Sequence, residues 1–183
     1  NFVFITYSGV NSMPDIAMKP NRRLLLFLPL AHVFARYMQF FCFAGNVSLG
    51  LSSNLKTILA DFKAFKPTFI LAVPRIFEKI YNAASQKAGA GFKGRVFADA
   101  TQTAYDWSHA QQSGGSIPLA LNAKHALYNK LVYSSIMEVF GGHVEYAVSG
   151  GAPLDSSIAH FFNGVGLPLL EGYGMTETCG AIS

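Results

Sequence analysis

The segment with the richest chemistry lies near the end of the chain and reads Glu171-Gly-Tyr-Gly-Met-Thr-Glu-Thr178. Its two glycines allow a tight turn and a close approach of the backbone to a ligand. The Thr176 hydroxyl can donate to a phosphate oxygen. Glu177 alone would repel that phosphate, but with Mg²⁺ between the two groups it becomes a metal ligand. The segment therefore suggests a nucleotide-phosphate site with magnesium, although a glycine-rich turn with a solvated glutamate explains it equally well in isolation.

A second segment, Ser149-Gly-Gly-Ala-Pro-Leu154, follows the apolar run Val144–Val148. Its small residues let a flat ring or a phosphate lie against the backbone, and the helix expected from Pro153 onward favours anions at its start. A nucleophile elbow is excluded because Ala147 stands where that motif requires glycine. Taken alone, a strand-to-helix turn of small residues is the simpler interpretation.

His32 lies in a third segment, Leu28-Pro-Leu-Ala-His-Val-Phe-Ala-Arg36. On a helix, His32, Arg36 and Gln39 would form one polar stripe on an otherwise apolar surface. A lone histidine in such a place is more often structural than functional. In a fourth segment, Val73–Glu78, Arg75 is within reach of an anion, but a strand-to-helix junction is the simpler interpretation.

Short apolar runs alternate with amphipathic segments along the chain. The runs predict strands at 23–29, 46–51, 68–73, 144–148 and 167–170. The amphipathic segments predict helices at 31–43, 55–65, 75–87, 119–140 and 155–163, with further helical stretches between 88 and 115. This alternation predicts an α/β fold, a mostly parallel sheet with helices on both faces. Because ligands bind beyond the carboxyl ends of such strands, the four segments are expected at one edge of the sheet.

The composition is 51% hydrophobic and only 13% charged. This charged fraction is about half that of a typical soluble domain, so we expect the chain to be the inner part of a larger protein. All 14 Lys and Arg lie scattered within residues 1–130, and no nucleic-acid partner is predicted. Cys42 and Cys179 have no metal-ligand spacing, which favours reduced thiols in the cytoplasm. Neither a signal peptide nor a transmembrane helix is predicted.

Taken in order, the four segments resemble the adenylate-forming (ANL) acyl-CoA synthetases. Residues Glu171–Glu177 resemble the Tyr-Gly-x-Thr-Glu motif of that superfamily. Three further segments resemble the long-chain fatty acyl-CoA synthetase branch in particular, and so does the long helical insertion between residues 85 and 140. These segments are Leu28–Phe34, Val73–Lys79 and Ser149–Pro153.

The resemblance implies that a long-chain fatty acid and ATP form an acyl-adenylate, which CoA then attacks to give the thioester. It places His32 near the carboxylate and Glu177 on Mg²⁺, with Thr176 on a phosphate. Implied contacts to the adenine and the acyl linkage come from Gly150, Gly151, Ala152, Glu171, Gly172, Tyr173, Gly174 and Met175.

The resemblance also implies that residues 1–183 are a partial AMP-binding domain, the central part of a large N-terminal domain. The phosphate loop and the C-terminal domain are then expected outside the chain, which alone would be inactive. An adenylation module for an amino or aryl acid, and a non-catalytic nucleotide- or lipid-binding module, are the alternatives. Acyl chain length, oligomeric state and peripheral membrane contact are left open.

Overall fold

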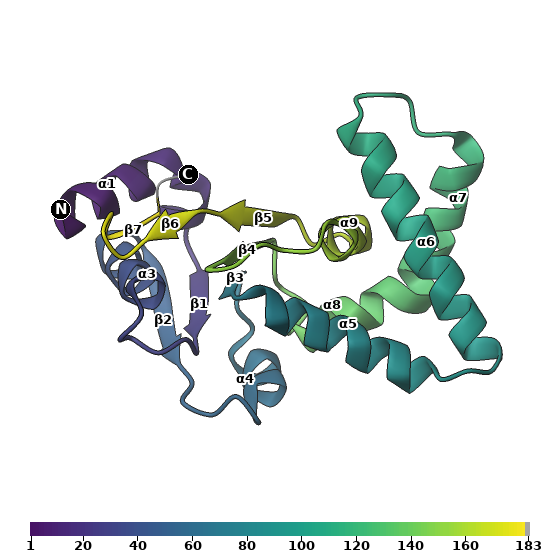
Figure 1. Cartoon of the computed structure of the whole chain (residues 1–183), viewed down its shortest axis with the longest axis horizontal. Helices are drawn as coiled ribbons and strands as arrows, with labels where there is room; N and C mark the ends of the chain where they lie inside the picture. Colours follow the sequence, from purple (N-terminus) through teal and green to yellow (C-terminus); the bar gives the residue numbers. More distant parts are fainter. Residues whose placement is uncertain (182–183) are drawn as a thin grey trace.

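The computed structural model of the chain describes residues 1–181. Its centre is a five-stranded sheet in the order β2-β1-β3-β4-β5, and all neighbouring strands are parallel. Figure 1 shows the sheet between two groups of helices. The predicted α/β class is confirmed. The strands are β1 Arg22–Leu26, β2 Val47–Leu51, β3 Phe69–Ala72, β4 Tyr146–Gly150 and β5 Leu169–Gly172.

Helices cover both faces of the sheet because its strands are apolar on both sides. Successive side chains of a strand point to opposite faces, so Leu24 and Leu26 pack in one core and Leu25 in the other. The first core lies under α1 (Phe2–Ser12), α2 (Pro14–Ala17) and α3 (Val33–Ala44). The second lies under α4 (Ile58–Phe65), α5 (Pro74–Ala88), α8 (Ser134–Val139) and α9 (Ser156–Val165).

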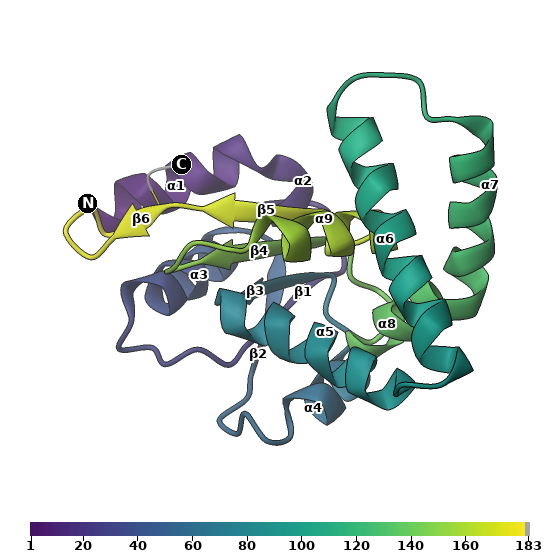
Figure 2. The same cartoon turned by 45° about the vertical axis from the view of Figure 1, so that its right-hand side comes forward.

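Two long helices, α6 (Phe92–Gln112) and α7 (Leu119–Tyr128), form a hairpin that extends beyond the sheet (Figure 2). The Tyr133 hydroxyl donates to the Ala100 carbonyl at 2.7 Å, and the rings of Trp107 and His125 stack with centroids 4.3 Å apart. The prediction of one continuous helix over 119–140 is wrong at residues 129–133. A π-helical turn, Asn129–Tyr133, separates α7 from α8.

Helix α4 begins later than predicted. The Asn54 side chain accepts the Lys56 N–H at 2.9 Å and so forms a turn before the helix. The expected apolar face from Leu55 to Phe65 is only partly buried, since Leu55 is 53% exposed while Ile58 is 4% exposed. Helices α1 and α2 and the short hairpin of β6 (Gly174–Met175) and β7 (Gly180–Ala181) were not predicted.

Arg22, at the start of β1, is a buried charge. It is 5% exposed, its Nη1 lies 2.7 Å from Glu145 Oε1, and its Nε has no hydrogen-bond partner among residues 1–181. Because a buried charge without its partner is costly, we predict that Glu145→Gln lowers the free energy of unfolding by roughly 1–3 kcal/mol. Thermal unfolding of the full-length protein measures this.

The control for that experiment is Asp15→Asn, which removes the partner of the exposed ion pair with Lys19 (2.9 Å). Exposed pairs contribute little, so this variant should unfold almost as the wild type does. Equal losses from the two variants would show that the burial of Arg22 is irrelevant.

Candidate active site

A cavity of about 460 Å³ opens at the carboxyl edge of the sheet, between the strand ends, α3 and the β6–β7 hairpin. Its wall is largely apolar. Helix α3 supplies Val33, Phe34, Tyr37, Met38 and Phe41, the strands supply Phe69, Leu71, Val148 and Leu170, and the α1–α2 region supplies Met13 and Ile16.

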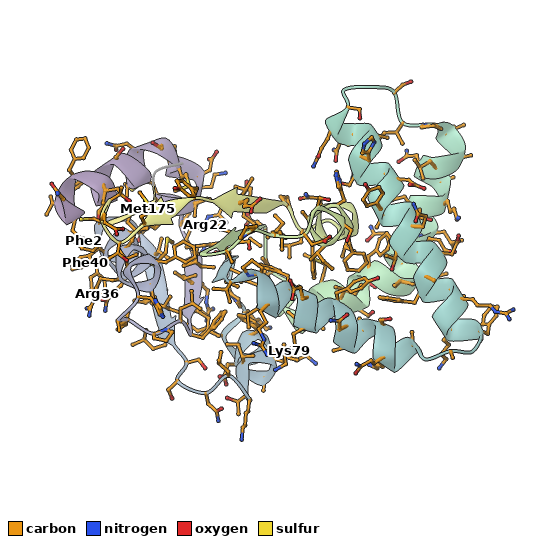
Figure 3. All side chains as sticks on the ribbon, viewed as in Figure 1. Phe2, Arg22, Arg36, Phe40, Lys79 and Met175 are labelled. Atoms are coloured by element: carbon orange, nitrogen blue, oxygen red, sulfur yellow. The ribbon has the colours of Figure 1, made fainter. Side chains whose placement is uncertain are left out.

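The cavity brings together most of the predicted site residues. Its lining includes His32, Gly151, Glu171, Gly172, Tyr173, Gly174, Met175 and Thr176. In Figure 3, Met175 of β6 lies on the side of the molecule where Arg36 and Phe40 project from α3. Three predicted residues, Gly150, Ala152 and Glu177, do not line the cavity.

The last residue of β4 and the loop that follows it are small for steric reasons. A Cβ added at Gly150 would lie 2.9 Å from Cζ of the Phe34 ring and 3.2 Å from the Gly172 carbonyl oxygen. Gly151 has a φ of +84°, which favours glycine. The Glu171 carboxylate accepts the Leu154 N–H at 3.0 Å. These contacts join the loop to the end of β5.

Strands β6 and β7 form an antiparallel hairpin with Thr176–Cys179 as its turn. Thr176 lines the cavity, and Glu177 is exposed at the tip. The half-buried Thr178 lies inside the turn, where its Oγ1 accepts the Met175 N–H at 3.2 Å. The sequence interpretation gave Thr178 no role. A threonine in a glycine-containing turn is the signal that could have identified it, since such hydroxyls bond to nearby backbone.

His32 precedes α3 instead of belonging to it. The predicted helical stripe of His32, Arg36 and Gln39 is therefore wrong for the histidine, although Arg36 Nη1 does donate to Gln39 Oε1 at 3.2 Å. The His32 side chain is exposed at the cavity rim. Its backbone carbonyl accepts the Arg36 N–H at 3.1 Å, and this bond fixes the histidine at the helix start.

The side chains present suit Mg²⁺ better than a metal whose ligands must all come from the protein. Within residues 1–181 there is no group of three or more His, Cys, Asp or Glu side chains able to hold a metal. Mg²⁺ usually needs only one or two carboxylates, with phosphate oxygens and water as its other ligands. A single exposed glutamate beside a threonine hydroxyl matches that requirement.

Neither cysteine gives the cavity a nucleophile. Cys42 is buried, and its burial raises the pKa of the thiol to about 12, so the thiol stays protonated at neutral pH. Cys179, in the hairpin turn, is absent from the cavity lining. Among the described helices, none is long and apolar enough to cross a membrane.

Residues 2–183 match the family model of the AMP-binding enzymes. Over 96% of its length the chain is 46% identical to the long-chain-fatty-acid–CoA ligase FadD15 of Mycobacterium bovis, and it spans 29% of that protein. Its structure is similar to the adenylation domain of a carboxylate reductase from Mycobacterium chelonae. That match has a TM-score of 0.62 and 24% identity, over 87% of this chain and 21% of the other.

The structure is also similar to O-succinylbenzoate CoA synthetase from Bacillus subtilis, solved in complex with ATP and magnesium. This match has a TM-score of 0.56 and 17% identity, and it covers 96% of this chain and 26% of the other. The two structural matches support the fold.

Proposed function

The chain belongs to the family of AMP-binding enzymes, and from this premise we propose that it forms part of an AMP-forming long-chain fatty acid:CoA ligase. In that reaction a fatty acid and ATP give an acyl-adenylate and pyrophosphate, and the CoA sulfur then displaces AMP. The observation that carries the proposal is the shape of the site. One cavity joins an apolar interior to a rim made of the residues 171–176.

The interior suits an acyl chain and the rim suits an adenylate. Leu71, Tyr37 and Phe41 offer apolar contact within the cavity. Burial of each methylene group contributes roughly 0.8 kcal/mol. At the rim, the Tyr173 ring is 60% exposed and therefore free to pack against a base.

We assign the remaining roles as follows. The backbone at Gly150–Ala152 and Glu171–Gly172 approaches the adenine closely, and Gly174 and Met175 border the acyl linkage. The Thr176 hydroxyl donates to a phosphate oxygen, and His32 contacts the carboxylate. Glu177 holds Mg²⁺, which when bound offsets negative charge on the phosphates as pyrophosphate leaves.

We further propose that residues 1–183 are the central part of an AMP-binding domain in a longer cytoplasmic enzyme. The chain spans 29% of the length of FadD15, which supports this. The phosphate loop and the C-terminal domain would then lie in other parts of the enzyme. The same assignment predicts no activity from this chain alone, since positioning of the triphosphate is much of the catalysis.

Acyl-chain preference tests the proposed function. In the full-length enzyme we expect kcat/KM to rise from acetate through octanoate to palmitate, because each added methylene is buried until the cavity is filled. Ligation assays with ATP, Mg²⁺ and CoA measure it, with benzoate as a compact aryl acid. A preference for benzoate would favour an aryl-acid adenylation module, and a preference for acetate would exclude a long-chain ligase.

A further inference from the structure

The turn that carries Thr176 and Glu177 depends on the side chain of Thr178. Thr178 Oγ1 accepts the Met175 N–H at 3.2 Å and lies 2.9 Å from the Met175 carbonyl oxygen and 3.0 Å from the Gly180 carbonyl oxygen. One hydroxyl can donate to either carbonyl while accepting the N–H. It therefore connects the last residue of β6 with the first residue of β7.

The backbone contributes two hydrogen bonds to this turn. The Thr178 N–H donates to the Met175 carbonyl at 3.3 Å and the Cys179 N–H to the Thr176 carbonyl at 3.0 Å. Cys179 has a φ of +64°, in the left-handed region that non-glycine residues rarely adopt. A strained residue of this kind persists only where surrounding contacts hold it, and the Thr178 hydroxyl bonds to both sides of it.

The base of the hairpin is already fixed on α3. Gly180 lies so close to Tyr37 that an added Cβ would be 3.1 Å from the Tyr37 Cβ, and its φ is +134°. Because the base packs closely against α3, most of the remaining freedom of the hairpin is in the turn residues 176–179. The Thr178 hydroxyl restricts that freedom.

We propose that Thr178 is a positioning residue for the magnesium-binding tip of the hairpin. It does not touch the ligand itself. Its hydroxyl holds the turn in the conformation in which Glu177 is presented to the metal. This inference rests on the proposed function, because it assumes that MgATP is the ligand at the tip.

The test compares Thr178→Val, which removes the hydroxyl at nearly constant shape, with Thr178→Ser, which keeps it. Binding of MgATP, and of ATP with EDTA, is measured by calorimetry on the full-length enzyme, with kcat and KM for MgATP. Loss of one or two hydrogen bonds predicts about tenfold weaker MgATP binding for the valine variant. Metal-free ATP should bind both variants nearly as it binds the wild type, and serine should restore MgATP affinity.

A double variant separates positioning from general damage. In a Glu177→Ala background the magnesium-dependent part of the ATP affinity is already lost. Adding Thr178→Val to this background should therefore weaken MgATP binding by a further factor of less than about two. A further tenfold loss in that background would overturn the inference, as would unchanged MgATP affinity in Thr178→Val. Equal loss for ATP with and without magnesium would also overturn it. If instead the wild type binds no MgATP at all, the proposed function fails, which is a different result.

Discussion

Glu177→Ala in the full-length enzyme is expected to reduce adenylation by more than tenfold without disturbing the fold. The carboxylate is exposed at the tip of the β6–β7 hairpin and makes no hydrogen bond or ion pair with the other residues of the 1–181 range. It therefore has no structural partner to lose. If Thr176 binds a phosphate as proposed, a carboxylate beside that phosphate is electrostatically unfavourable unless a cation lies between the two groups.

Pyrophosphate exchange with palmitate, ATP and Mg²⁺ measures this prediction. Glu138→Ala is the matched control, because Glu138 is also an exposed glutamate but lies in α8, away from the cavity lining. A variant with Asp at position 177 should keep part of the activity and require more magnesium. Retention of more than about a tenth of the wild-type rate by Glu177→Ala, a barrier change under about 1.4 kcal/mol, would refute the metal role.

The parallel sheet could be predicted because its inner strands β1 and β3 are buried on both faces and are therefore continuous apolar runs. Leu24–Leu26 and Phe69–Ala72 are such runs. The prediction that their carboxyl ends share an edge followed from topology alone. This is why residues as distant in sequence as His32, Gly151 and Thr176 were expected together, and the cavity lining does bring them together.

The elements that were missed are those set by tertiary contacts. Residues Phe2–Ser12 include aromatic and β-branched residues with weak helical periodicity, yet they form α1 because Thr6 and Val10 are buried where this helix packs against α2 and α3. Strands β6 and β7 have two residues each, too short for any periodic pattern. Their pairing depends on the Thr178 hydroxyl and on the Gly180–Tyr37 contact, neither of which periodicity can show.

The packing of the helical insertion should depend strongly on one glycine of α9. Gly164 is buried in α9 where this helix crosses α6, and a Cβ added to it would lie 2.1 Å from the Ala104 carbonyl oxygen. The Gly164 carbonyl itself lies 2.5 Å from His125 Nε2. We predict that Gly164→Ala lowers the free energy of unfolding by roughly 2 kcal/mol despite the higher helix propensity of alanine, and that Gly164→Val lowers it further.

Thermal unfolding of the full-length enzyme should show the Gly164→Ala midpoint roughly 2 °C below that of the wild type. Gly115→Ala is the matched control, because the same methyl group at position 115 would have no heavy atom within 4 Å. Since the clash at Gly164 is with the backbone of Ala104, Ala104→Gly should not rescue the variant. An unchanged midpoint for Gly164→Ala, or full rescue by Ala104→Gly, would show that α6 and α9 do not approach as closely as the structure has them.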